Sequence, residues 1–135
     1  MGIRSQVKSD DATAQLRTAF LSAITSLRFV DLQLYDSIRV FPDQCVTLPR
    51  IGIAILNAGL VNMSYAILPA TEHEIALLAN YLSTELLAIL FLPILRAKRV
   101  ASAAGPPLLT VVMSDTAYDA DIKTAGPVLQ QLNKP

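Results

Sequence analysis

The feature that most constrains this sequence is an apolar run of about twenty residues in its second half. Residues 75–95 read IALLANYLSTELLAILFLPIL, and hydrophobic side chains lie on every side when the run is plotted as a helix. Three cations, Arg96, Lys98 and Arg99, follow the run and suit the negative end of a helix. A helix of this composition has no face for water, so the sequence predicts that protein or lipid covers it.

A second apolar segment precedes this run. Residues 51–68 read IGIAILNAGLVNMSYAIL and carry few polar interruptions. The short acidic connection at residues 69–74 joins this segment to the apolar run at residues 75–95. We therefore expect a central apolar helical hairpin with arms at about 51–68 and 72–98.

The N-terminal part of the chain predicts an amphipathic helix at about residues 10–27, after a polar arm at residues 1–8. Ser9 or Asp10 can cap the first turn, and the apolar residues recur at helical spacing. They are Leu16, Phe20, Ile24 and Leu27. This helix is expected to pack one face on the rest of the domain.

A change of period follows the amphipathic segment. Val30, Leu32 and Leu34 alternate with polar residues, which predicts a small β element at about residues 29–48. The tail at residues 101–135 contains a Gly-Pro-Pro break and is expected to be peripheral. At 135 residues the chain suits a single domain.

These segments together predict a mainly α fold, a helical bundle built around the apolar hairpin, and the composition of the chain is unusually apolar for a soluble domain. Hydrophobic residues make up 53% of the chain and charged residues 16%, against averages of about 45–50% and about 25%. Eleven cations balance eleven anions, which argues against strong electrostatic attraction to nucleic acid or anionic lipid.

Either a lipid bilayer or further protein could bury the apolar surface of the hairpin. Arg50 before the first arm, the cations after the second and the acidic loop between them fit a two-helix transmembrane hairpin with both termini in the cytoplasm. Glu85 and its polar neighbours, however, offset much of the gain from inserting the leucines into lipid. The other covering is further copies of the same protein.

Close helix contact is expected along the hairpin in either setting. Gly52, Gly59 and Ala66 repeat every seven residues and would lie on one helix face, where another backbone can approach. Asn80 and Glu85 are expected to form the polar part of this helix–helix interface.

Candidate binding residues are few. The basic cluster of Arg50, Arg96, Lys98 and Arg99 could contact phosphates of lipid headgroups or of nucleic acid. The sequence shows no glycine-rich phosphate loop, no nucleophile elbow and no spacing typical of metal ligands. We therefore expect no catalytic residue, no metal and no cofactor.

The sequence alone thus favours a non-enzymatic structural subunit that self-associates through its apolar helices, as in a filament, a capsid-like shell or a ring. Its expected partners are copies of itself, with nucleic acid contacted only through the basic cluster and no small-molecule substrate. Its expected location is cytoplasmic or particle-associated. The alternative is a small integral membrane protein, with the lipid bilayer as partner.

Overall fold

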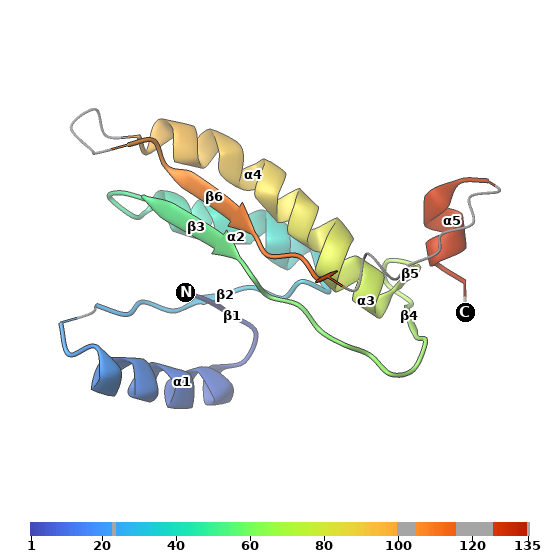
Figure 1. Ribbon diagram of the computed structural model, residues 1–135, viewed down its shortest axis with the longest axis horizontal. Helices are drawn as coiled ribbons and strands as arrows, with labels where there is room; N and C mark the ends of the chain where they lie inside the picture. The colour runs from blue at the N-terminus through green and yellow to red at the C-terminus, as the bar shows by residue number, and fades with distance from the viewer. Residues whose placement is uncertain (23, 100–104, 116–125, 135) are drawn as a thin grey trace.

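Two parallel strands lie at the centre of the structure (Figure 1). The computed structural model describes residues 1–22, 24–99, 105–115 and 126–134. Strand β3 (Ile53–Leu56) pairs along its whole length with β6 (Leu108–Val111), and Ile53 faces Leu108 in the register. Strand β6 belongs to the tail at residues 101–135, which was expected to be peripheral, so part of this tail lies in the central sheet.

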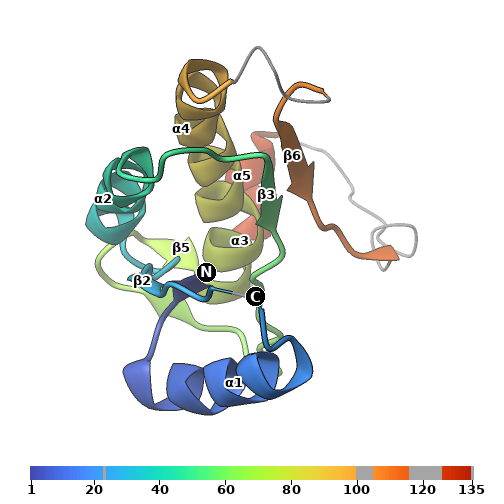
Figure 2. The same cartoon turned by 90° about the vertical axis from the view of Figure 1, so that its left-hand side faces the viewer.

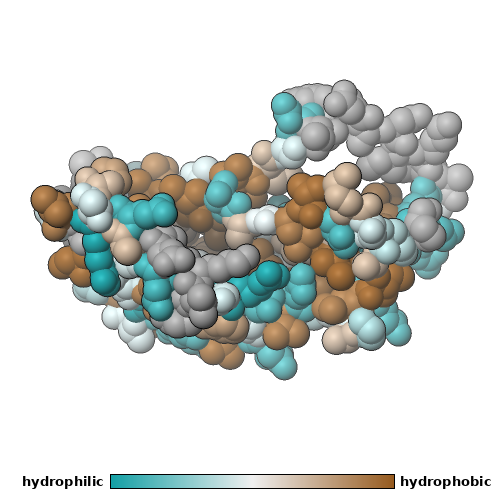
Figure 3. Space-filling view, turned by 90° about the horizontal axis from the view of Figure 1, so that it is seen from below, coloured by the Kyte–Doolittle hydropathy of each residue, from teal (hydrophilic) through white to brown (hydrophobic). Residues whose placement is uncertain are grey.

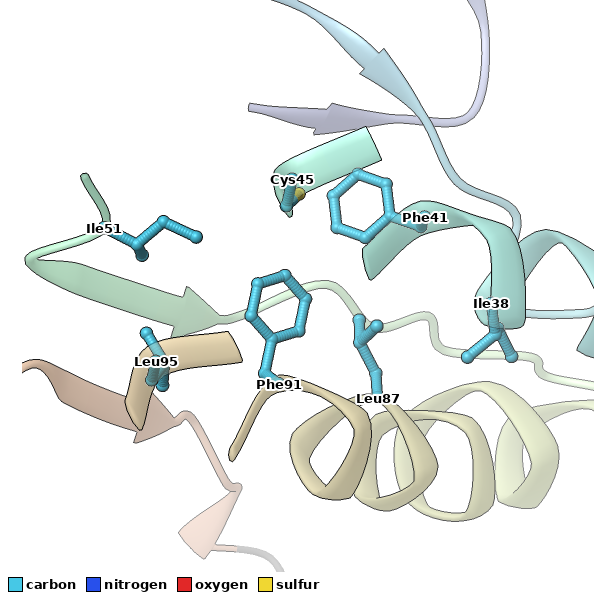
Figure 4. Packing of buried hydrophobic residues seen from close by; sticks show 7 residues of the cluster. All are labelled: Ile38, Phe41, Cys45, Ile51, Leu87, Phe91 and Leu95. Atoms are coloured by element: carbon cyan, nitrogen blue, oxygen red, sulfur yellow. The ribbon is translucent and has the colours of Figure 1, made fainter. Parts of the chain in front are cut away.

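Helices α2 (Tyr35–Val46) and α4 (Ser83–Ala97) pack on the same side of this strand pair (Figure 2). The rings of Phe41 and Phe91 meet between the helices, with centroids 6.0 Å apart and planes tilted by 53° (Figure 4). The buried cluster consists of Ile38, Phe41, Cys45, Ile51, Leu87, Phe91 and Leu95. The hydrophobic core therefore lies between the two helices and the inner face of the β3–β6 pair.

The crossover from β3 to β6 contains a long helix. A short antiparallel pair, β4 (Ile67–Leu68) and β5 (His73–Glu74), precedes it. The helix then begins with α3 (Ile75–Leu77), continues through the π-helical turn η1 (Leu78–Leu82) and ends with α4. A helical crossover between neighbouring parallel strands is a βαβ unit, the building block of α/β folds.

A second strand–helix–strand unit stands at the N-terminus. Strand β1 (Gly2–Ile3) pairs in parallel with β2 (Arg28–Phe29), and helix α1 (Gln6–Ala19) joins them. The Arg28 guanidinium donates to the backbone oxygen of Gln44, 3.0 Å away, and to the Thr47 hydroxyl. These bonds attach the N-terminal unit to the C-terminal end of α2.

The last described helix, α5 (Val128–Leu132), is attached to the β4–β5 pair through Asn133. The Asn133 side chain accepts a hydrogen bond from the Glu74 amide at 2.9 Å and lies 2.9 Å from His73 Nδ1. The Tyr65 hydroxyl donates to the Asn133 backbone oxygen. One asparagine thus connects two segments about sixty residues apart.

The expected helical bundle is wrong: the chain is a mixed α/β structure with parallel strands. A helix is present from Ile75 to Ala97, but residues 51–68 form β3, a loop and β4 instead of the other hairpin arm. Ile51, Ile53 and Ile55 alternate with small residues, which suits a strand in a parallel sheet. A short apolar run does not distinguish such a strand from a buried helix, and the strand pairing with β6 decides it here.

The other predicted boundaries also differ from the structure. The β element expected at 29–48 is confined to β2, and α2 follows it, because Ile38, Phe41 and Cys45 are spaced for one helix face and are all buried. The N-terminal helix covers Gln6–Ala19 instead of 10–27. It ends early because the chain must extend to pair Arg28 with Gly2.

The transmembrane hairpin is wrong for the same reason, since one of its two arms is a strand and loop. By length and composition, the helix Ile75–Ala97 could cross a membrane, with a mean hydropathy of 1.9. In the structure, 39% of its most apolar window is buried by the protein itself. Core helices of soluble proteins pass the same test of length and composition.

Much apolar surface remains on the described residues. Ile53 and Ile55, on the outer face of β3, are each 63% exposed, and Leu108 of β6 is exposed beside them. Viewed from below, the surface shows hydrophobic patches between hydrophilic ones (Figure 3). The expectation that α4 has no face for water is only partly met, because Ile89 and Leu92 are exposed.

The packing predicts a large contrast between two neighbouring positions of α4. Phe91→Ala removes a ring that is 5% exposed and lies against Phe41, and it should lower the free energy of unfolding by about 3–5 kcal/mol. Ile89→Ala, at a position that is 62% exposed, should change it by about 0.5 kcal/mol or less. Urea unfolding followed by circular dichroism measures both, and equal effects would contradict this core.

Candidate functional site

The segments that follow strands β1, β2 and β3 meet around one hollow of about 210 Å³. Arg4 directly follows β1, Asp31 lies two residues after β2, and Gly59 lies three residues after β3. The full lining is Gly2, Arg4, Val30, Asp31, Leu32, Gln33, Ala58, Gly59, Leu60 and Ala79. In open α/β sheets, ligands bind in the crevice outside the carboxyl ends of the strands.

A larger hollow of about 630 Å³ adjoins the first, and both are lined by Ala58, Gly59 and Leu60. It lies at the carboxyl ends of β3 and β6. Its further lining residues are Asn57, Val61, Asn80, Tyr81, Val112, Met113 and Ser114. Its walls are mainly apolar, with two side-chain amides and two hydroxyls among them, which is the usual make-up of a small-molecule site.

Asn80 fixes the loop that separates the two hollows. Its side-chain Oδ1 accepts a hydrogen bond from the Leu60 amide at 2.8 Å, and its Nδ2 donates to the Leu60 oxygen at 2.8 Å. A single side-chain amide therefore satisfies both backbone groups of Leu60. This pairing holds the chain in a defined position as it leaves β3.

Gly59 allows the same loop to approach Asn80 closely. A Cβ atom at position 59 would lie 3.2 Å from Asn80 Oδ1. A larger residue would thus push against the amide that holds Leu60. Glycine here permits close contact between the loop and the helix.

The turn that carries Asn80 is a π-helix, Leu78–Leu82. The Ser83 amide donates to the Leu78 oxygen, five residues back, and the Thr84 hydroxyl donates to the Ala79 oxygen at 3.1 Å. Such turns are rare in proteins, and those that occur often lie at functional sites. The extra residue in the turn changes the direction in which the following side chains point, and Asn80 points to the loop after β3.

Asp31 supplies the carboxylate of the smaller hollow. Its Oδ1 accepts a hydrogen bond from the Gln33 amide at 2.9 Å, and its own amide donates to the Ser37 hydroxyl at 2.9 Å. The Asp31 side chain is half-buried. These local bonds fix the turn after β2 and hold the carboxylate at the edge of the hollow.

The structure separates the residues expected to share a helix face. Gly52 precedes β3, Gly59 lies in the loop after it, and Ala66 precedes β4, so they form no common face. Of the expected polar interface residues, Asn80 lies at the hollow and bonds to Leu60. Glu85 is half-buried in the first turn of α4 and lines neither hollow.

The predicted basic cluster forms at the opposite end of the strands. Arg50 and Lys98 line one small hollow, and Arg96 and Arg99 line a second one. Pro106 and Pro107 line both of these hollows. The cluster thus gathers before β3 and at the C-terminal end of α4, away from the carboxyl-end hollows, and its phosphate contacts stay a prediction.

The single cysteine and the single histidine of the chain do not lie together in a catalytic site. Cys45 is buried, and burial raises the pKa of its thiol, although the Arg28 charge offsets part of the rise. His73 contacts Asn133 just before the start of the helix Ile75–Ala97 and lines neither hollow. Among the described residues, no group of three or more potential ligands is placed to hold a metal ion.

Comparison with known proteins shows similarity to short-chain dehydrogenases along the whole chain. It is 47% identical over 134 residues to the short chain dehydrogenase virL of Hypocrea virens, a match that covers 99% of this chain and 39% of that protein. It is 34% identical to the short chain dehydrogenase/reductase mfmJ of Annulohypoxylon moriforme, over 100% of this chain and 40% of that protein. For the short chain dehydrogenase opdN of Penicillium oxalicum the identity is 37%, over 98% and 45%.

The chain spans about two fifths of the length of the curated relatives it matches. No family model matches the sequence, and no solved structure matches it. The similarity agrees with the α/β architecture and its parallel strands.

These relatives overturn the functional prediction. A non-enzymatic structural subunit, whether a filament, shell or ring, is wrong, because the whole chain resembles oxidoreductases. The expectations that the chain is not an enzyme and has no small-molecule substrate are wrong for the same reason. No contact between copies bears on self-association, which stays a prediction.

Sequence reasoning missed most of the site because it assigned the segment after β3 to a helix. An apolar strand followed by Asn57-Ala58-Gly59 is a signal for a loop at a strand end, and it was available in the sequence. Arg4, Asp31 and Ser114 were missed as well. Arg4 and Asp31 reach the smaller hollow and Ser114 reaches the larger one only through the strand pairing, which no local pattern shows.

The contact between Asn80 and Leu60 makes a prediction about local stability. Asn80→Ala should raise the rate of amide hydrogen exchange at Leu60 about tenfold, since the bond that protects this amide is lost. Asn62→Ala is the matched control, because Asn62 bonds only within its own turn. Exchange followed by NMR measures both, and unchanged protection in Asn80→Ala would contradict the role of this side chain.

Proposed function

We propose that this chain forms part of a short-chain dehydrogenase/reductase that transfers a hydride between a nicotinamide adenine dinucleotide and a small organic molecule. The residues described here would hold the adenosine end of the dinucleotide in the smaller hollow and form one wall of the substrate site in the larger one. The similarity to dehydrogenases over the whole chain supports the reaction class.

The observation that carries the proposal is the meeting of strand carboxyl ends at the two adjoining hollows. When parallel strands are joined by helical crossovers, the loops that follow the strands lie at one edge of the sheet. This is the edge where α/β proteins bind nucleotides. The loop after β3 lines both hollows. A ligand that spans them would lie across Ala58, Gly59 and Leu60.

The smaller hollow fits an adenine ring. Val30, Leu32 and Leu60 give it apolar walls, and Ala58 and Gly59 leave room for a flat ring to approach the backbone. Asp31 stands at its edge, where a carboxylate can accept a hydrogen bond from the exocyclic amine of adenine. Apolar walls with a carboxylate acceptor at the edge suit a purine with an exocyclic amine.

The chain's residues fit only part of the dinucleotide. Its five glycines are widely separated in the sequence, and no G-x-G-x-x-G turn is among them. The proposal therefore assigns no diphosphate contact to these residues. It concerns the adenosine end and the substrate wall.

The larger hollow has the polarity that an alcohol or carbonyl substrate needs. When bound, the dinucleotide supplies the hydride acceptor or donor. Ser114, which follows β6, can donate a hydrogen bond to a substrate oxygen, and Asn57 can hold another polar group. Val61, Val112 and Met113 would bind the apolar remainder of the substrate and exclude water.

Binding of adenosine 5′-monophosphate tests this assignment. Ala58→Phe fills the smaller hollow and should weaken binding about tenfold or more in isothermal titration. Ala70→Phe, at an exposed position in the β4–β5 turn, is the control and should bind as the unmodified chain does. Circular dichroism checks that both variants are folded.

Two outcomes would contradict the proposal. The unmodified chain could show no affinity for the nucleotide, or Ala58→Phe could bind it as tightly as Ala70→Phe does. Either result would show that the smaller hollow does not bind the nucleotide.

A further inference from the structure

We propose that Asn133 is a positioning residue for the larger hollow, which it shapes through the loop between β3 and β4. The proposal rests on the proposed function, because it takes the larger hollow as the place where the substrate meets the reactive end of the dinucleotide. Asn133 lines neither hollow. It acts through residues 61–65 of the loop, which we call the outer loop segment.

The loop between β3 and β4 is attached near both of its ends. Near the start, Asn80 holds Leu60 through two hydrogen bonds of 2.8 Å. Near the end, the Tyr65 hydroxyl donates to the backbone oxygen of Asn133. The outer loop segment lies between these two attachments.

The two attachments serve different hollows. Residues 58–60, at the first attachment, line both hollows, whereas Val61, just beyond it, lines the larger hollow and not the smaller one. Val61 and Met63 are 87% and 93% exposed, so little packing fixes the outer loop segment. Its position at the larger hollow therefore depends on the attachment at Tyr65.

Strand β5 fixes the side chain of Asn133. The Oδ1 atom accepts a hydrogen bond from the Glu74 amide at 2.9 Å, so the Nδ2 atom faces His73 Nδ1, also at 2.9 Å. Because a side-chain amide nitrogen donates, His73 accepts on Nδ1 and carries its proton on Nε2. Strand β5 pairs with β4, the strand that follows the loop. Asn133 thus links the outer loop segment to this strand pair.

Helix α5 has little else to hold it in place. It lies at the end of the long helix where β4 and β5 pair (Figure 1). None of its five residues is buried, and Val128 and Leu129 are both exposed. A helix this short is not stable by itself. Its position therefore depends largely on the two bonds of the Asn133 side chain, and the backbone oxygen that Tyr65 uses moves with it.

Loss of this attachment should affect one hollow and spare the other. Asn133→Ala removes both bonds to β5 and releases the acceptor of Tyr65, and Tyr65→Phe removes the bond to the loop directly. A hydrogen bond between neutral groups changes an equilibrium by about three- to tenfold. The smaller hollow should keep its shape, because Asn80 still holds Leu60.

Isothermal titration of the full chain with two nucleotides tests the proposal. Adenosine 5′-monophosphate reports on the smaller hollow, and NAD⁺, whose nicotinamide end reaches the larger one under the proposed function, reports on both. Asn133→Ala and Tyr65→Phe should each weaken binding of NAD⁺ about three- to tenfold and leave binding of the monophosphate within about twofold. Gln130→Ala, at an exposed position of α5, is the matched control and should change neither affinity. Circular dichroism checks that the variants are folded.

The outcomes separate this proposal from the proposed function. An equal loss of affinity for both nucleotides would show a general structural role for Asn133. Unchanged affinity for NAD⁺ in either variant would show that the outer loop segment does not position the ligand. Each of these results overturns the proposal and leaves the nucleotide site in place. If the unmodified chain binds neither nucleotide, the proposed function fails and the proposal fails with it.

Discussion

The packing of α4 against α2 and the inner face of the β3–β6 pair forms the hydrophobic core on which the rest of this structure depends. Leu87, Phe91 and Leu95 lie one turn apart on one face of α4 and are all buried. Without that contact, nothing would cover the inner face of the two strands. A two-stranded sheet alone is only marginally stable. The same contact fixes the crossover, and with it the turn that carries Asn80.

The functional geometry follows from this packing. Parallel pairing brings the loop after β3 and the loop after β6 to the same edge. The π-helical turn then directs Asn80 to Leu60, so the helix that stabilises the core also positions the loop between the two hollows. Core and site are thus coupled through one continuous helix, Ile75–Ala97.

Local patterns in the sequence predicted part of this arrangement. The helix near residues 72–98 follows from an apolar run with an acidic start and a basic end, features that act within a few residues. The strand at β3 was misassigned, because an apolar segment such as residues 51–56 fits a buried strand or a buried helix equally well. The difference lies in a partner strand more than fifty residues away. Arg4, Asp31 and Ser114 were missed for the same reason, since only long-range pairing gathers them.

The most direct test of this account is to map where an adenine nucleotide binds. Backbone NMR spectra of the chain, recorded with increasing adenosine 5′-monophosphate, report each amide separately. The account predicts that the largest shifts fall on residues 58–60 after β3 and on Asp31 after β2. Shifts concentrated at the opposite end of the strands, around Arg50 and Lys98, would contradict it.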